Sequence, residues 1–238
     1  MSALLAVFAH PDDETFRAGG TLALLVQAGV HVHLVTATRG ESGSCGDPPL
    51  CNPEDLSIIR EQELHCACAA LGIAPPQVLS YPDGKLQQVY PEALIAAILA
   101  AIQESNPEVM LTFGPDGLSG HPDHIAIGEY AAEAFRRSKE VDALYTLAVP
   151  LSLAQKLEMH QIHPIPDQEI SLCVDVSSVW ETKLTAMRCH ATQWSSSPMT
   201  SAPEERQRLF FGREYFVQAA SRNLETNFLP SALQEYLR

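Results

Sequence analysis

The sequence is short of basic residues and has no long hydrophobic run. Only 15 lysines and arginines stand against 29 acidic residues, which gives a formal net charge of −14. Nucleic acids and anionic lipids are bound by clustered basic side chains, so we expect neither as a partner. The longest wholly apolar stretch, residues 93–102, is half of the roughly 20 residues that a membrane-spanning helix needs. The N-terminus has no basic segment before its apolar run, so we expect no signal peptide and a cytoplasmic protein.

The six cysteines include no C-x-x-C pair of the kind that holds a structural metal. Without an export signal, we expect reduced thiols. Cys66 and Cys68 lie two residues apart in an expected helix and therefore face different directions. Cys45 and Cys51 share a loop rich in Gly and Pro, where a disulfide or a metal contact is an open alternative to ordinary loop side chains.

Strand-like and helix-like segments alternate along the chain, a pattern typical of a parallel sheet covered by helices on both faces. We predict strands at residues 4–9, 30–38, 77–81, 109–113, 143–149, 170–176 and 214–220. We predict helices at residues 14–27, 53–71, 91–104, 125–137 and 179–192, and a short helix within 151–168. This indicates a single Rossmann-like α/β domain over residues 1–238, with a core at about 3–220 and a C-terminal extension at 221–238.

Two histidine-containing strings follow predicted strands. The first is Ala9-His10-Pro11-Asp12-Asp13-Glu14, and the second is Gly120-His121-Pro122-Asp123-His124. In an open α/β sheet, ligands bind outside the carboxyl ends of the strands. Both strings therefore lie where a binding site is expected, at strand-to-helix turns on one edge of the sheet.

The residue types in these strings are those of a catalytic metal site. His10, Asp13 and His124 offer two imidazoles and a carboxylate, a set that holds zinc and leaves a position open for water. Asp12, next to a ligand, is placed to act as the general base. His121 is placed to stabilise an oxyanion as an imidazolium. Iron is an alternative metal, because the ligand set admits both zinc and iron. Glu14 or Asp123 would orient a metal-binding histidine by a hydrogen bond to its other ring nitrogen.

A purely structural interpretation is available for part of each string. Proline followed by acidic residues is an ordinary way to begin a helix. Helix initiation does not, however, require a histidine before each proline or another after Asp123. The sequence also lacks a G-x-S-x-G nucleophile elbow and has no G-x-G-x-x-G after the first strand, which disfavours a serine hydrolase and a dinucleotide-binding domain.

These strings resemble those of the PIG-L/LmbE-like N-acetylglucosaminyl deacetylases, whose signatures are His-Pro-Asp-Asp and His-Pro-x-His. The similarity extends over about residues 3–220. It includes Thr38-Arg39-Gly40-Glu41, Arg60 with Glu63, Pro82-Asp83-Gly84, Gly114-Pro115-Asp116-Gly117, and a late pattern from Lys183 to His190-Ala191-Thr192-Gln193. The resemblance implies a zinc-dependent hydrolase that removes an N-acetyl group from an N-acetylglucosamine derivative through a zinc-bound water.

By this resemblance His10, Asp13 and His124 bind zinc, Asp12 is the base and His121 polarises the acyl oxygen. Arg60 and Asp83 match positions that contact the polar part of the substrate in relatives. Some members carry a tyrosine where this chain has Ser119, so another tyrosine, or His121 with the metal, would have to take its part.

The partner expected from the resemblance is a small amino-sugar substrate, and a homo-oligomer is possible. Two other functions stay open. One is an amidase of the same chemistry that acts on a thiol-conjugate amide, and the other is a non-catalytic sugar-binding protein on this fold. Retention of Asp12 weighs against the second, because binding alone does not need a base. The loops at residues 39–52 and 151–168, which would choose the substrate, carry no pattern that identifies it.

Overall fold

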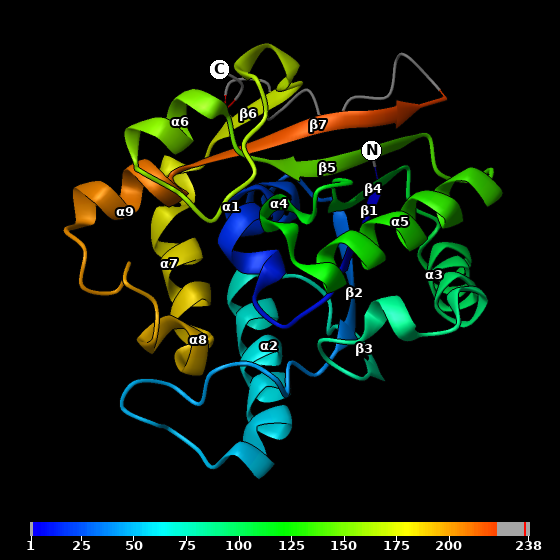
Figure 1. Cartoon of the computed structure of the whole chain (residues 1–238). Helices are drawn as coiled ribbons and strands as arrows, with labels where there is room; N and C mark the ends of the chain where they lie inside the picture. The colour runs from blue at the N-terminus through cyan, green and yellow to red at the C-terminus, as the bar shows by residue number, and fades with distance from the viewer. Residues whose placement is uncertain (1, 223–235, 237–238) are drawn as a thin grey trace.

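Seven strands form one mixed sheet in the order β3-β2-β1-β4-β5-β7-β6 in the computed structural model, which describes residues 2–222 and 236 (Figure 1). The strands are β1 (Ala3–Phe8), β2 (His31–Thr38), β3 (Gln77–Tyr81), β4 (Val109–Phe113), β5 (Ala143–Ala148), β6 (Leu172–Asp175) and β7 (Arg213–Ser221). The first five run parallel to one another, and β7 is antiparallel to both β5 and β6. The predicted α/β class is confirmed.

Helices cover both faces of the sheet, which explains why every residue of β1 and of β4 is buried. The helices α1 (Asp13–Gln27), α2 (Leu56–Leu71) and α7 (Trp180–Cys189) pack against one another, and α3 (Pro91–Ser105) packs against α5 (Pro122–Arg137) (Figure 1). Shorter helices are α4 (Gly117–Gly120), α6 (Leu151–Lys156), α8 (Ala191–Ser195) and α9 (Glu204–Phe211).

The strand order reverses at β1. The chain runs outward from β1 to β2 and β3, then returns to place β4 on the other side of β1. The strands β1 and β4 are hydrogen-bonded in parallel, with Leu4 opposite Val109 and Ala6 opposite Leu111. Their carboxyl ends therefore lie side by side, and a crevice for a ligand opens where the connections diverge. The two histidine-containing strings follow these two strands, as the sequence predicts.

The structure corrects two helix predictions. The helix expected at 53–71 begins as a 3-10 turn, Pro53–Asp55, before α2. The helix expected at 179–192 is two helices, α7 and α8, because His190 leaves helical geometry with a ψ of 55°. Its buried ring hydrogen-bonds a carboxylate on α1 instead. The helices α4 and α9 were not expected.

The expectation that all six cysteines are reduced is wrong for one pair. Cys66 on α2 and Cys189 at the end of α7 form a disulfide, and 123 residues separate them. The sequence does not reveal this pair, because only the packing of α2 against α7 brings the two thiols together. Cys45 and Cys51 are not disulfide-bonded.

Among the described residues, no helix is long and apolar enough to cross a membrane. The C-terminal extension expected at 221–238 lies outside the described part of the chain, apart from residues 221, 222 and 236.

Candidate active site

The turn after β1 is built around two acidic side chains that fold back onto the backbone. The Asp13 carboxylate accepts hydrogen bonds from the backbone N–H groups of Ala9 and His10, at 3.2 and 2.8 Å. The Glu14 carboxylate accepts one from the N–H of Asp12, at 3.0 Å. These bonds hold Asp12 at a φ of 116°, a conformation that residues with a side chain rarely adopt and that often marks a functional site.

The second string places its histidines at the start of α5. Pro122 is the first residue of the helix, and the His121 ring accepts a hydrogen bond at Nδ1 from the Asp123 N–H, at 3.2 Å. The His124 Nδ1 lies 3.1 Å from the carbonyl oxygen of Gly117, so its N–H points there. This leaves the Nε2 lone pair of His124 free to face the crevice. The ring of His124 also stacks on Phe113, with centroids 3.9 Å apart.

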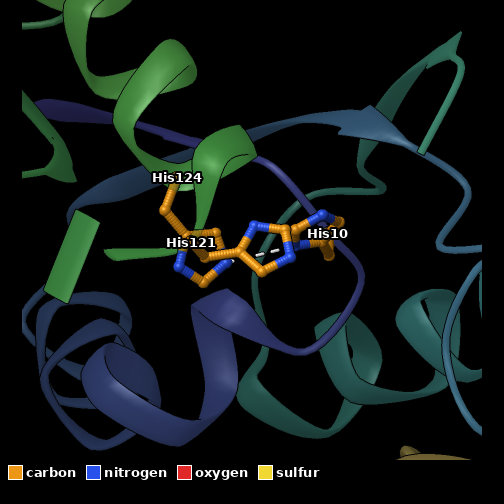
Figure 2. A group of neighbouring side chains, drawn as sticks. All are labelled: His10, His121 and His124. Carbon is orange, nitrogen blue, oxygen red and sulfur yellow. Dashed lines mark hydrogen bonds between the residues drawn. The ribbon is translucent and has the colours of Figure 1, made fainter. Parts of the chain in front are cut away.

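The three predicted metal ligands, His10, Asp13 and His124, come together between the two strings, and Figure 2 shows the two histidines among them. The His10 Nδ1 lies 3.1 Å from the His124 Nε2 and 3.6 Å from an Asp13 carboxylate oxygen. The other Asp13 oxygen lies 3.3 Å from the His124 Nε2. Ligands bonded to one tetrahedral zinc at 2.0–2.2 Å are about 3.4 Å apart, so these separations fit a single ion.

His121 is also close to this group, as Figure 2 shows. One ring nitrogen each of His10, His121 and His124 lies within 4.8 Å of the others. Burial, together with the charges of the other two histidines, lowers the pKa of His121. Because its Nδ1 accepts a hydrogen bond, the neutral ring carries its proton on Nε2 and is a hydrogen-bond donor there. This differs from the imidazolium expected from the sequence.

Carboxylates surround His10. Its Nε2 lies 3.0 Å from Asp83 and 3.3 Å from Asp123, on the side opposite to Asp13. Burial by itself lowers the pKa of His10, but the hydrogen bonds to Asp123 and Asp83 raise it to about 10. Burial likewise disfavours ionised Asp13, yet His124 and His10 hold its pKa below the usual range. Such an excess of negative charge suits a bound cation.

The carboxylates behind His10 are themselves held in place. Asp123 accepts hydrogen bonds from the N–H groups of Gly84 and Leu86, at 2.7 and 2.9 Å. Asp83 accepts one from the Ser42 N–H, at 2.8 Å. These bonds fix the side of His10 that faces away from the other ligand atoms, the arrangement usual around metal-ligating histidines.

Asp12 lies beside this group and contacts Arg60, with 3.3 Å between the carboxylate and the guanidinium. Burial raises the pKa of Asp12 to about 6, and the Arg60 charge limits the rise. Arg60 also donates to the carbonyl oxygens of Gly40, at 2.7 Å, and Pro11. Gly40 has a φ of 70°, and a Cβ there would lie 2.2 Å from the guanidinium, so glycine is required where Arg60 passes.

The late sequence pattern supports the site from α7 and α8. The His190 Nε2 lies 2.8 Å from Glu14, the residue that also holds the Asp12 backbone. Thr192 donates twice to Glu63, at 2.8 and 2.7 Å. Gln193 lines the crevice directly. The pattern is visible in the sequence but the roles of these residues are not, because their partners lie up to 176 residues away.

A cavity of about 390 Å³ opens over these groups. It is lined by His10, Asp12, Asp13, Phe16, Ser42, Gly43, Arg60, Asp83, Gly84, His121, His124 and Gln193. No tyrosine is among the lining residues in the described part of the chain. Among the described lining residues, none is therefore a tyrosine that could take the part expected of one at the Ser119 position.

The fold and these donors define a Rossmann-like α/β protein with a crevice that can hold a metal ion between histidines and aspartates. The chain belongs to the PIG-L family: the family model described as "PIG-L: GlcNAc-PI de-N-acetylase" matches residues 5–135. The resemblance found in the sequence is thus confirmed.

Two relatives are similar over most of the chain. A 1D-myo-inositol 2-acetamido-2-deoxy-alpha-D-glucopyranoside deacetylase of Mycobacterium sp. (strain JLS) is 33% identical, over 82% of this chain and 75% of its own length. A probable N-acetyl-alpha-D-glucosaminyl L-malate deacetylase 2 of Bacillus cereus is 34% identical, over 80% of this chain and 83% of its own.

Solved structures share the fold at lower identity. A conserved protein of Thermus thermophilus has a TM-score of 0.70 at 24% identity and covers 97% of this chain and 100% of its own. The 4-carboxy-2-hydroxymuconate hydratase of Pseudomonas putida KT2440 has a TM-score of 0.67 at 18% identity, over 95% of this chain and 100% of its own. Since one of these proteins is a hydratase, the fold alone does not fix the reaction, which must be argued from the site.

Proposed function

We propose that this protein is a metal-dependent hydrolase that removes the N-acetyl group from an N-acetylglucosamine derivative. The observation that carries the proposal is the convergence of His10, Asp13 and His124 beside a carboxylate, Asp12, that is not part of the ligand set. Family membership and the names of the two relatives support the choice of substrate class.

The three converging residues would hold the metal, with zinc the proposed ion and iron the alternative. Such an ion supplies a water of lowered pKa and polarises the acyl oxygen of the substrate. The carboxylates on the far side of His10, Asp83 and Asp123, fix the orientation of its ring. On this proposal Glu14 acts indirectly, because it accepts a hydrogen bond from the Asp12 backbone N–H and binds His190.

Asp12 is the proposed general base. Its pKa of about 6 lets it be ionised at neutral pH and still accept the proton of the attacking water. Arg60 holds the carboxylate in position through the 3.3 Å contact. The proton then passes to the leaving amine as the C–N bond breaks, so that one amide and one water yield acetate and a free amino sugar.

His121 is the proposed donor to the acyl oxygen. Its neutral ring lines the cavity and carries its proton on Nε2, and this N–H would donate to the oxygen on which negative charge develops as the carbonyl is attacked. We assign Arg60 and Asp83 a smaller role in substrate binding than the sequence suggested. Arg60 is 3% and Asp83 8% exposed, and the contacts described for them are within the protein. Each side chain still lines the cavity, and we propose that both form part of its polar wall.

The test is acetate release by the purified protein from N-acetylglucosamine conjugates. We expect turnover that a chelator abolishes and that added zinc restores, with iron(II) as a parallel arm that separates the two metals. Asp12→Asn is the matched control, since it removes the base without changing size. Tight conjugate binding with no acetate from any conjugate at any metal loading would instead identify a sugar-binding protein and overturn the proposal. Release of a different acyl group from a thiol-conjugate amide would favour the amidase alternative.

A further inference from the structure

A second cavity of about 700 Å³ adjoins the proposed active site. Asp12, Phe16 and Gln193 line both this cavity and the one over the histidines, so the two are neighbours with a shared wall. The rest of its wall comes from Arg17 on α1, residues 157–162, residues 197–199 and α9. A substrate whose acetamido group reached Asp12 would therefore extend its other end into this second cavity.

Two arginines line this cavity in a chain that is strongly acidic overall. They are Arg17, half-buried on α1, and Arg206, exposed on α9. Within residues 2–222, neither guanidinium has a carboxylate within ion-pair distance, unlike Arg39, Arg60, Arg136, Arg137, Arg208 and Arg213. Arg17 lies over the Phe210 ring, 4.2 Å from its centroid, and Arg206 donates to the carbonyl oxygen of Leu157 at 3.3 Å. Most of their hydrogen-bonding capacity is left for a ligand.

Arg17 keeps its charge in this position. Burial lowers its pKa to about 10, and Glu214 opposes the decrease, so the group is protonated at neutral pH. The acidic residues of the cavity do not neutralise it: Asp12 is paired with Arg60, and Glu158 is exposed. Apolar side chains, among them Leu157, form much of the remaining wall. A partly desolvated guanidinium against an aromatic ring binds a carboxylate more strongly than one in open solvent.

We propose that this second cavity binds the group attached to the amino sugar, and that this group carries a carboxylate recognised by Arg17, with Arg206 as a second contact. The inference rests on the proposed function and narrows its substrate class. Of the two relatives, one is named for a malate conjugate, which is a dicarboxylate, and the other for an inositol conjugate, which is neutral. The arginines favour a substrate of the first kind.

The experiment compares N-acetylglucosamine linked to L-malate with N-acetylglucosamine linked to myo-inositol. We expect the wild-type protein to prefer the malate conjugate in kcat/KM. We expect Arg17→Met to lower kcat/KM for that conjugate by about 10- to 100-fold, the value of a hydrogen bond between charged groups. For the inositol conjugate the change should stay within about twofold, because no charge is recognised there. Retained activity on the neutral conjugate also shows that the variant is folded.

Further variants test whether the charge or the shape of the arginine side chain produces the preference for the malate conjugate. Arg17→Lys keeps the positive charge and should recover part of the lost preference, whereas Arg206→Met should reduce it less than Arg17→Met does. Arg136→Met is the matched control, because Arg136 is exposed on α5 and pairs with Glu133. Arg136→Met should leave kcat/KM unchanged for both conjugates. A wild-type preference for the inositol conjugate, or equal losses on both conjugates in Arg17→Met, would overturn the carboxylate site.

A calorimetric titration with the two deacetylated conjugates gives a readout that needs no turnover. Weaker binding of glucosaminyl malate by Arg17→Met, with glucosaminyl inositol unaffected, supports the carboxylate site even if no acetate is released. In that case the proposed function fails and the binding site stands. If instead both conjugates are deacetylated and Arg17→Met changes neither turnover nor binding, the proposed function stands and the carboxylate site fails.

Discussion

The His10 Nδ1 lies 3.1 Å from the His124 Nε2, although 114 residues separate the two side chains in the chain. The contact exists because β1 and β4 are neighbours in the sheet and each histidine follows its strand by a short connection. The two nitrogens also lie near the Asp13 carboxylate, at 3.6 and 3.3 Å from its two oxygens, so the three side chains converge on one region. Asp12, one residue away in sequence, points instead to Arg60.

This geometry predicts that metal binding and turnover can be separated by mutation. His10→Ala or His124→Ala removes a donor and should lose most of the bound metal. Asp12→Ala should keep the metal but lose turnover by at least about 100-fold, the usual contribution of a general base. Metal content by mass spectrometry and acetate release measure the two effects. His65→Ala, at an exposed position on α2, is the control; equal metal loss in the Asp12 variant would contradict the division of roles.

The pH dependence of the reaction should report Asp12 and its partner. The base acts only when ionised, so kcat/KM should rise with pH through the pKa of Asp12, which burial raises to about 6. The Arg60 charge favours the ionised form, so Arg60→Met should move this acid limb to higher pH. Arg39→Met, which removes an arginine paired with Glu61 near the surface, should leave the limb in place. The measurement is kcat/KM as a function of pH. An acid limb that stayed in place in Arg60→Met would mean that Asp12 is not the group whose ionisation produces it.

Much of this arrangement can be predicted from the sequence, because the signals are local. The alternation of strands and helices indicates the parallel sheet, and apolar runs locate β1 and β4 to within a residue or two. Both histidine strings follow strands, and the general rule for open α/β sheets then places them at one edge. That β1 and β4 are adjacent follows from the topology and makes His10 and His124 neighbours.

Other features depend on contacts between distant segments and leave no local signal. The disulfide between Cys66 and Cys189 requires the packing of α2 on α7. The break after α7 is invisible in the helical pattern of residues 179–192, since it is set by the bond between His190 and Glu14 on α1. The second cavity brings Arg17, within the helix predicted at 14–27, against residues 157–162, 197–199 and α9, and no sequence pattern indicates that these segments meet.

The buried pair of His190 and Glu14 should contribute to stability in a pH-dependent way. Burial lowers the pKa of His190, but Glu14 and Asp12 raise it more, so the folded-state pKa lies above the ordinary value. Protonated His190 therefore stabilises the fold fully at pH values below the unfolded-state pKa of about 6.5, and this contribution is lost as pH rises through the folded-state pKa.

We accordingly expect His190→Gln to lower the free energy of unfolding most at about pH 6 and less at about pH 9. Urea denaturation at several pH values measures the difference from the wild-type protein. His31→Gln, at an exposed position on β2, should show no such trend. A deficit that grew toward alkaline pH would mean that His190 is neutral in the folded protein.

Lys183, the first residue of the late sequence pattern, should be structural and not catalytic. Its ammonium is buried and lies 2.7 Å from Glu214, whose carboxylate also accepts the backbone N–H groups of Gly20 and Thr21 on α1. Burial lowers the pKa of Lys183, and Glu214 offsets part of the decrease. Lys183→Met leaves Glu214 buried without its cationic partner, which should cost about 3–5 kcal/mol of unfolding free energy.

The folded fraction of Lys183→Met should keep its kcat, because Lys183 does not line the crevice that contains Asp12 and the histidines. Denaturant unfolding gives the stability, and acetate release normalised to the folded fraction gives the activity. Lys139→Met, at an exposed position after α5, should change neither quantity. A Lys183 variant of normal stability and impaired kcat would place this residue in the reaction, because the loss could not then be assigned to the buried pair that anchors α1 beneath the first histidine string.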